Sequence, residues 1–351
     1  MPLRITPLAE QDHDLSSGPS SHRLVWLAEE VPGGGGGPAA IDPPAYPVGS
    51  AYLRLSTAPG RDHLAELDLA VHPAARRTGV GTRLLDAALA GARAEGRRTV
   101  TAQVALVGGA VERPGGLEEQ EGLEGQEGGD GGGVAAAFLT ARGFRVVLTL
   151  TFARLVTADA DPVALAALAA DPHPGYRLTS WTGTVPDELA ETFAASRWAM
   201  DDMPMDEMDH GTETWDVDRV RAVARAVEQR GELLHTVAAV SEADGTIVGF
   251  TELVVPGDGT GDGLHYGTGV LPAHRGRGLA RWMKAESIRT ALTTHPALTG
   301  LVTDTADANA PMRAVNDALG YVPTHRSVYL QRELGNAPMA TAGLCAGLAA
   351  W

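Results

Sequence analysis

Two stretches of the chain repeat one pattern of residue types, and this pattern suits the binding of an anion. Residues 71–81 and 270–280 align without gaps as Val-x-Pro-x-x-Arg-x-x-Gly-x-(Gly/Ala). Glycines let backbone N–H groups approach an anion closely, and an arginine adds a full positive charge. A helix that begins at this point adds the positive end of its dipole. Each stretch therefore predicts a cradle for a pyrophosphate group.

The candidate ligand-binding residues lie in and beside these two cradles. In the first cradle they are Val71, Arg76, Gly79, Gly81 and Thr82. In the second they are Val270, Leu271, Arg275, Gly276, Arg277, Gly278, Leu279 and Ala280.

Each cradle needs a strand before it and a helix after it. In the first half, alternation over 63–71 predicts a strand, an apolar stripe predicts a helix over 82–95, and 97–104 reads as a second strand. The second half repeats the order with a strand over 264–270, a helix over 279–292 and a strand over 301–305. This order forms a βαβ unit with a right-handed crossover, and it occurs twice.

A further helix follows in each half and ends in glycine and an aromatic residue. The first spans 135–142 before Gly143 and Phe144, and the second runs from Asn309 to Gly320 and Tyr321. Asn309 suits an N-cap and Gly320 suits a helix end. Strands over 146–155 and 326–334 come next.

These features together resemble GCN5-related N-acetyltransferases (GNAT), over roughly residues 48–155 and 176–334, and most of all tandem-domain members similar to mycothiol synthase. The resemblance implies an α/β (α+β) fold with two tandem GNAT domains. Each has a mixed, mostly antiparallel sheet with a splayed central pair of parallel strands, flanked by helices. It also implies transfer of an acetyl group from acetyl-CoA, as co-substrate and without a metal, to the primary amine of a small molecule. Asn309 joins the cofactor-binding candidates.

Composition divides the chain into unequal segments. We expect an N-terminal domain over 1–156, a linker over 157–175, a C-terminal domain over 176–334 and a poorly ordered tail over 335–351. Within the first domain, residues 107–133 are rich in glycine and glutamate. Such a segment has too little apolar surface to offset its ordering entropy, which predicts a disordered insertion.

The resemblance places a backbone N–H near Val270 or Val71 on the thioester carbonyl, and it requires a base. We propose Glu252 and His265 as catalytic candidates. Glu252 equally fits a sheet-face carboxylate in water, and His265 fits a surface histidine. In the first half Glu66 stands five residues before Val71, as His265 stands five residues before Val270.

The tyrosine that many family members use as general acid is missing from both halves. Asn316 and Leu139 stand at its position, and Tyr266 and Tyr321 are poor substitutes. The second half is expected to be active and the first degenerate or structural, because the last helix of the second half is intact and the insertion interrupts the first.

The segment 201–210 carries five acidic residues and no lysine or arginine. By resemblance it lines the acceptor site, where it would attract a cationic amine. A solvated acidic loop explains the same residues.

Bulk properties exclude several classes of protein. The net charge of −16 argues against nucleic acid, and no apolar run is long enough to span a membrane. A single cysteine, Cys345, and the lack of a His-Glu-x-x-His motif argue against disulfides and a helical zinc site. We expect a cytoplasmic monomer or homodimer. A dinucleotide-dependent oxidoreductase is disfavoured because the third glycine of its motif is missing. A non-catalytic acyl-CoA-binding or regulatory module stays open.

Overall fold

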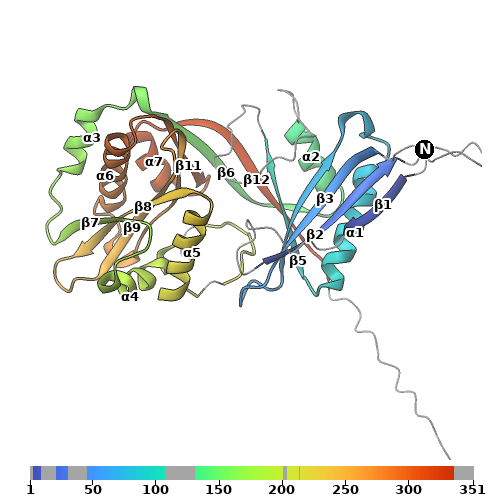
Figure 1. Ribbon diagram of the computed structural model, residues 1–351, viewed down its shortest axis with the longest axis horizontal. Coiled ribbons are helices and arrows are strands. Elements are labelled where there is room, and N and C mark those ends of the chain that lie inside the picture. Colours follow the sequence, from blue (N-terminus) through green and yellow to red (C-terminus); the bar gives the residue numbers. More distant parts are fainter. Residues whose placement is uncertain are drawn as a thin grey trace, which may run out of the picture.

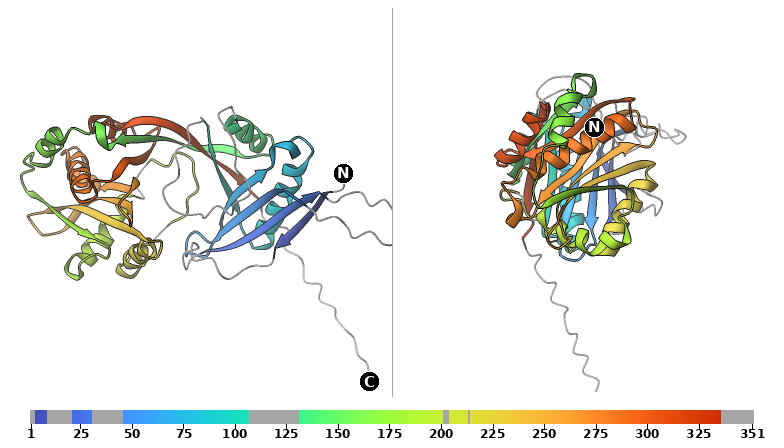
Figure 2. Two further views of the ribbon diagram at one scale, coloured as in Figure 1. Left: turned by 45° about the horizontal axis from the view of Figure 1, so that its top comes forward. Right: turned by 90° about the vertical axis from the view of Figure 1, so that its left-hand side faces the viewer.

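The computed structural model of the chain describes residues 3–8, 21–30, 46–106, 131–200, 204–212 and 214–335. Its described strands form one sheet of twelve, in the order β1-β2-β3-β4-β5-β12-β6-β11-β10-β9-β8-β7. Two lobes lie at the ends of this sheet, and the long strands β6 and β12 cross between them (Figure 1). The turned view shows the same two lobes end to end, with the long strands running from one to the other (Figure 2).

The first half supplies β1 (Leu3–Leu8), β2 (Ser21–Glu30), β3 (Tyr46–Ser56), β4 (Leu64–Val71) and β5 (Thr99–Ala105). Helix α1 (Val80–Ala94) joins β4 to β5, and α2 (Gly131–Thr140) precedes β6 (Arg145–Val156). The apolar side of α1, which includes Leu84, Leu85 and Leu89, packs on one core with strands β2 to β5. Residues 107–130 of the predicted insertion lie outside the described residues, and α2 already begins at Gly131.

The second half begins with α3 (Pro162–Ala169), β7 (Tyr176–Thr182), α4 (Asp187–Ser196) and α5 (Val217–Gln229). Strands β8 (Glu232–Ser241), β9 (Ile247–Pro256) and β10 (Gly261–Val270) form a meander. Helix α6 (Leu279–Thr294), β11 (Leu298–Ala306), α7 (Ala310–Ala318) and β12 (Val322–Glu333) complete it. The order of strand, turn, helix and strand predicted for each half is therefore confirmed.

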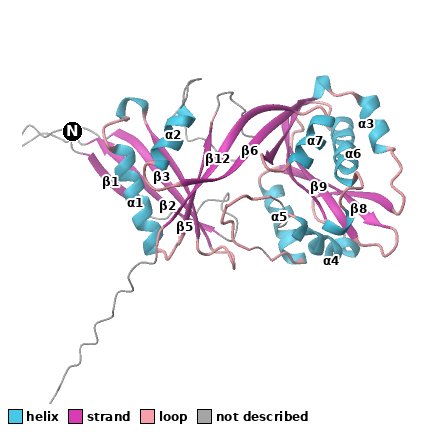
Figure 3. Ribbon diagram, turned by 180° about the vertical axis from the view of Figure 1, so that it is seen from behind, coloured by secondary structure: helices cyan, strands magenta, loops and turns pink. Residues whose placement is uncertain are grey.

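Helices cover both faces of the second-half sheet. Alternate residues of β9 separate the two layers, because successive side chains of a strand point to opposite faces. Phe250 and Val254 pack with α4 and α5, whereas Leu253 and Val255 pack with α6. The view from behind shows α4 and α5 on one side of the lobe and α6 and α7 on the other (Figure 3).

The last strands of the two halves are exchanged. Strand β6 comes from the first half of the chain but pairs with β11 of the second, and β12 comes from the second half but pairs with β5 of the first. The two exchanged strands also pair with each other. The domain boundaries at 156 and 176 stay a prediction, since one sheet runs through both halves.

The fold class is the one predicted, with a parallel pair in the middle of each half. Strands β4 and β5 pair from Leu64 to Leu67, and β10 and β11 pair from Gly261 to Leu264. The other described pairings are antiparallel. Within the described residues, no helix is long and apolar enough to cross a membrane.

Candidate active site

The second cradle is a glycine-lined turn between β10 and α6. Gly276 and Gly278 have φ of 75° and 79°, a region that residues with a side chain rarely adopt. The Nε of Arg275 donates a hydrogen bond of 2.9 Å to the carbonyl of Val270, so this arginine closes the turn. A Cβ on Gly276 would meet no atom within 4 Å, and the backbone at this point faces open space. The turn therefore fits the close approach of a pyrophosphate.

The remaining candidates of the second cradle have defined places. Leu271 donates its N–H to the carbonyl of Val248, which fixes the end of β10. Leu279 is buried in the first turn of α6, and Ala280 follows it there. The guanidinium of Arg277 lies 5.9 Å from the ring centre of Tyr176.

The first cradle repeats this turn with one strained residue. Arg76 donates from Nε to the carbonyl of Val71 at 3.2 Å, and Gly79, with φ of 93°, caps α1. Arg77 stands where the second cradle has Gly276 and has a φ of 64°. This conformation costs a residue with a side chain about 1–2 kcal/mol.

Helix α2 covers the first cradle. Arg142 donates from Nη2 to the hydroxyl of Thr82 at 2.6 Å and lies 3.7 Å from the ring centre of Phe138. A Cβ on Gly81 would come 3.4 Å from that phenylalanine ring. Thr82 is thus already hydrogen bonded within the protein.

Beyond their last paired residues, the parallel strands of each half part into a fork. In the second half the last pair is Leu264 and Val302, although β10 and β11 run on to Val270 and Ala306. In the first half the last pair is Leu67 and Ala102. A fork of this kind opens a passage through the sheet close to each cradle.

A β-bulge distinguishes the second fork from the first. The register of β10 against β9 shifts between His265 and Gly267, which leaves Tyr266 as the extra residue. The pairing of β3 with β4 runs without a shift. Strands β3 and β9 can be aligned at the glycine that pairs with the last valine of β4 and of β10. In this alignment Leu67, and not Glu66, occupies the position of His265. The equivalence assumed for Glu66 is wrong, since counting along the chain does not see the inserted residue.

Glu252 lies on the face of the sheet that α4 and α5 cover. It is 4% exposed and accepts a 2.5 Å hydrogen bond from Nη1 of Arg197. The guanidinium of Arg197 also lies 4.1 Å from the ring centre of Trp215 and 4.7 Å from that of Phe250. The carboxylate thus has a cation as its partner, as expected for a charge within an apolar strand.

His265 lies on the opposite face, toward α6. It is 4% exposed, and its ring hydrogen bonds with the backbone of Glu252. Its burial, and then the charge of Lys284, lower its pKa well below the usual value, so the ring is neutral at pH 7. The ring of Tyr321 lies 6.1 Å away, and its buried hydroxyl lacks a partner in the described chain.

The two asparagines of α7 have different partners. Asn309 caps the helix, because its side-chain oxygen accepts from the N–H of Met312. Asn316, at the position of the missing tyrosine, is buried and accepts from Lys284 at 2.7 Å. It also donates to the hydroxyl of Thr305 at 2.9 Å.

The structure adds a carboxylate that sequence reasoning missed. Asp304 lies on β11, two residues beyond the last parallel pair and on the face of Glu252. Its side chain is exposed, yet desolvation, opposed by the charge of Lys284, raises its pKa. The signal was available, since Asp304 interrupts the apolar strand 301–305.

The first fork contains a cavity of about 240 Å³. Its lining comes from both parallel strands and from α2, and includes Leu67, Ala102 and Phe138. The cavity lies in the passage that the parting strands leave, so the first half has room for a slender apolar group.

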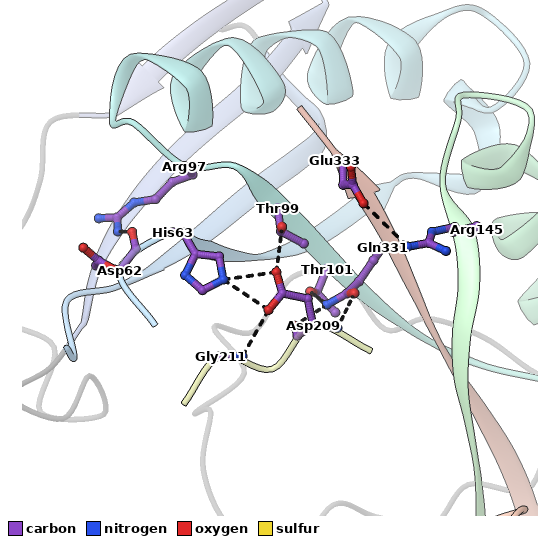
Figure 4. A network of polar contacts seen from close by, with 10 residues as sticks. All are labelled: Asp62, His63, Arg97, Thr99, Thr101, Arg145, Asp209, Gly211, Gln331 and Glu333. Atoms are coloured by element: carbon purple, nitrogen blue, oxygen red, sulfur yellow. Dashed lines mark hydrogen bonds and ion pairs between the residues drawn. The ribbon is translucent and has the colours of Figure 1, made fainter. Parts of the chain in front are cut away.

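The acidic segment 201–210 contributes hydrogen bonds between the two halves. Asp209 accepts hydrogen bonds from His63 at 3.1 Å and Thr99 at 3.1 Å, both in the first half (Figure 4). Its backbone N–H donates to Gln331 of β12, and Glu207 pairs with Arg145. Two of the acidic residues expected to attract an amine therefore have partners, and Asp201 and Asp202 lie outside the described residues.

Comparison with known proteins identifies the family. Residues 7–107 and 194–321 match the acetyltransferase (GNAT) family. These regions make up more than half of the chain, and the protein belongs to this family. Members of the family generally use acetyl-CoA. No curated protein matches the sequence.

Solved structures include a similar tandem protein. A tandem GNAT protein from the clavulanic acid biosynthesis pathway is 25% identical, with a TM-score of 0.66 over 96% of this chain and 100% of its own. A GCN5-related N-acetyltransferase from Sphaerobacter thermophilus is 16% identical, with a TM-score of 0.56 over 88% and 80%. This second likeness shows the fold alone. The predicted tandem GNAT resemblance is confirmed.

Proposed function

We propose that the protein transfers an acetyl group from acetyl-CoA to the primary amine of a small molecule, and that the second half carries out the transfer. Membership of the GNAT family supports acyl transfer in general. One observation favours the second half: among the described residues, helices cover the face that carries Glu252 only in this half. There α4 and α5 enclose the face that carries Glu252. In the first half the corresponding face leaves Tyr52, Arg54 and Glu66 exposed.

The bulge of β10 supports the same assignment. A bulge leaves its extra residue outside the ladder and turns the strand. Backbone N–H groups near Tyr266 are therefore available to a thioester carbonyl in the fork, where they would stabilise the developing oxyanion. The uninterrupted β4 of the first half offers no such break.

The acceptor proton needs a base, because a protonated amine cannot attack. Glu252 is held by Arg197, and His265 is enclosed on the other face. Asp304, which is exposed at the fork and has a raised pKa, is the carboxylate we propose for this role. The exposed carboxylate of Asp304 favours a cationic amine as acceptor.

Matched disruption of the cradles tests which half is active. Gly79 and Gly278 cap α1 and α6 with left-handed backbone, so Gly79→Glu and Gly278→Glu place the same carboxylate at equivalent positions. A Cβ on Gly278 also comes 3.2 Å from His173, whereas one on Gly79 meets no atom within 4 Å. Thiol release from acetyl-CoA with a panel of polyamines and aminoglycosides measures turnover. We expect a loss of at least about 10-fold only in Gly278→Glu, because the carboxylate repels the pyrophosphate. A loss confined to Gly79→Glu contradicts the assignment.

A non-catalytic acyl-CoA-binding role for the first half is the second candidate. The cavity at its fork favours this role, since it offers an apolar lining behind the first cradle. Titration of the Gly278→Glu variant with acetyl-CoA in a calorimeter tests it. Binding without turnover supports a binding site in the first half, and the lack of binding contradicts it.

A further inference from the structure

A lysine lies at a core position of α6, where packing alone does not call for a charged side chain. Lys284 is 1% exposed. Its Nζ donates to Oδ1 of Asn316 at 2.7 Å and to the hydroxyl of Thr303 at 3.4 Å. In the aligned helix of the first half the same position is Leu85, a buried apolar residue. Burying an ammonium group is costly, so a role beyond packing is required to explain it.

Lys284 lies at the point where β10 and β11 part. Thr303, which it contacts, is the first residue of β11 beyond the last parallel pair. His265 is the first residue of β10 beyond that pair, and it interacts electrostatically with Lys284. The ammonium nitrogen also lies 4.9 Å from the ring centre of Tyr321. The charge is thus at the base of the fork.

A buried polar atom without a partner lies beside this charge. The hydroxyl of Tyr321 is buried without a hydrogen-bond partner in the described part of the chain. An unpaired buried polar atom costs roughly 1–3 kcal/mol. A pocket of about 550 Å³, lined by β6, β11, α7 and β12, reaches Asn316 and Thr305. A polar ligand in the fork would satisfy the hydroxyl of Tyr321.

We propose that Lys284 is the proton donor for the thiolate that leaves acetyl-CoA in the second half, and that Asn316 positions it. This inference rests on the function proposed above for that half. Asn316 stands where the resemblance expects a tyrosine acid, but an amide cannot supply a proton. Its side-chain oxygen instead holds the ammonium group that can.

The proton balance of the transfer closes with these groups. The neutral amine attacks the thioester carbonyl, a C–N bond forms and the C–S bond breaks. The leaving sulfur takes a proton from the Lys284 ammonium, which gives free thiol and a neutral lysine. The proton lost by the amine passes to Asp304 or solvent, and one proton returns to Lys284 before the next turnover.

The electrostatics of the fork suit this role. Burial lowers the pKa of Lys284 to about 7, and Asp304 on β11 opposes the shift. The other titratable groups facing it are His265 of β10, which is neutral at pH 7, and Tyr321 after α7, whose pKa burial raises. A general acid works best when its pKa is close to the working pH.

The decisive variant is Lys284→Met, which places an apolar side chain where the first half has Leu85. We expect kcat to fall about 100-fold, with little change in the KM for acetyl-CoA. In the unmodified protein kcat should decline as the pH rises through about 7, and this decline should be absent from the variant. Leu85→Met is the matched control and should keep both kcat and its pH profile.

Three outcomes separate the hypotheses. A Lys284→Met protein that binds acetyl-CoA and keeps both kcat and the alkaline decline overturns the proton-donor role alone. Equal loss of acetyl-CoA binding and turnover also overturns it, because the lysine would then be structural. If the Gly278→Glu variant keeps full turnover, the assignment of catalysis to the second half fails instead.

Discussion

At the scale of single residues, the pair formed by Arg197 and Glu252 is a buried charge pair that packs against aromatic rings. Arg197→Met should lower the free energy of unfolding by about 3 kcal/mol, because it leaves Glu252 buried and unpaired. The double variant Arg197→Met with Glu252→Gln should recover part of this loss, since it removes the unpaired charge. Urea unfolding of the single and double variants measures both effects. Equal losses in the two proteins would show that the charge pair is not the cause.

Lys284 predicts a pH dependence of stability as well as of catalysis. An unfolded lysine has a pKa of about 10.4, whereas burial lowers that of Lys284 to about 7. Between these values the unfolded state binds the extra proton, so the free energy of unfolding rises with pH across this window. Below about pH 7 the lysine is charged in both states and its burial penalty is complete.

Lys284→Met should therefore lose this pH-dependent contribution. The gain in stability over the unmodified protein should be largest below about pH 7 and should shrink as the pH rises. Urea unfolding at pH values on both sides of 7 provides the measurement. Stability differences that stay constant with pH would contradict a lowered pKa.

Some residues of the site could be named from the sequence and others could not. The glycines and arginines of both cradles follow a local pattern, because a tight turn dictates residue type directly. Lys284 stands in the sequence where the aligned helix of the first half has Leu85, but its partners come from β11 and α7, so its pairing could not be read from the sequence. Burial and pairing depend on the fold.

At the scale of elements, the linker between the halves is attached to α6. The indole of Trp282 donates to the carbonyl of Ala169 at 2.9 Å, and the ring of His173 stacks on the indole at 4.2 Å. The same histidine would lie 3.2 Å from a Cβ on Gly278. Helix α3 is thereby fastened beside the second cradle.

Trp282→Phe should loosen this attachment while keeping the stack. It removes a hydrogen bond worth about 1 kcal/mol, so amide hydrogen exchange in α3 should become faster. Exchange in α1, which packs on β1 to β4 of the first half, serves as the internal reference. Unchanged protection of α3 would show that the indole bond does not hold it.

The order of the elements followed from periodicity, but two features of the sheet did not. Tyr266 carries no turn or glycine signal that would announce a bulge, and the bulge is defined only against β9. The exchange of β6 and β12 depends on pairing between residues far apart in sequence, which local patterns do not encode.

At the scale of the whole molecule, neither half has a complete sheet of its own. Strand β5 lies between β4 and β12, and β12 comes from the end of the chain. A chain truncated after Val156 should therefore expose the edge of β5 and aggregate. Size-exclusion chromatography and circular dichroism measure the result, with co-expression of residues 157–351 as the rescue. A soluble truncated chain that unfolds cooperatively would contradict the prediction.

The exchange of strands also sets an order of events during synthesis. A ribosome releases the first half long before residues 322–333, which are the partner of β5. Until they emerge, β5 presents unpaired backbone groups, and domains generally fold as units from the N-terminus. The first lobe can close its sheet only when the second is almost fully translated, so β12 is the last strand to join the common sheet.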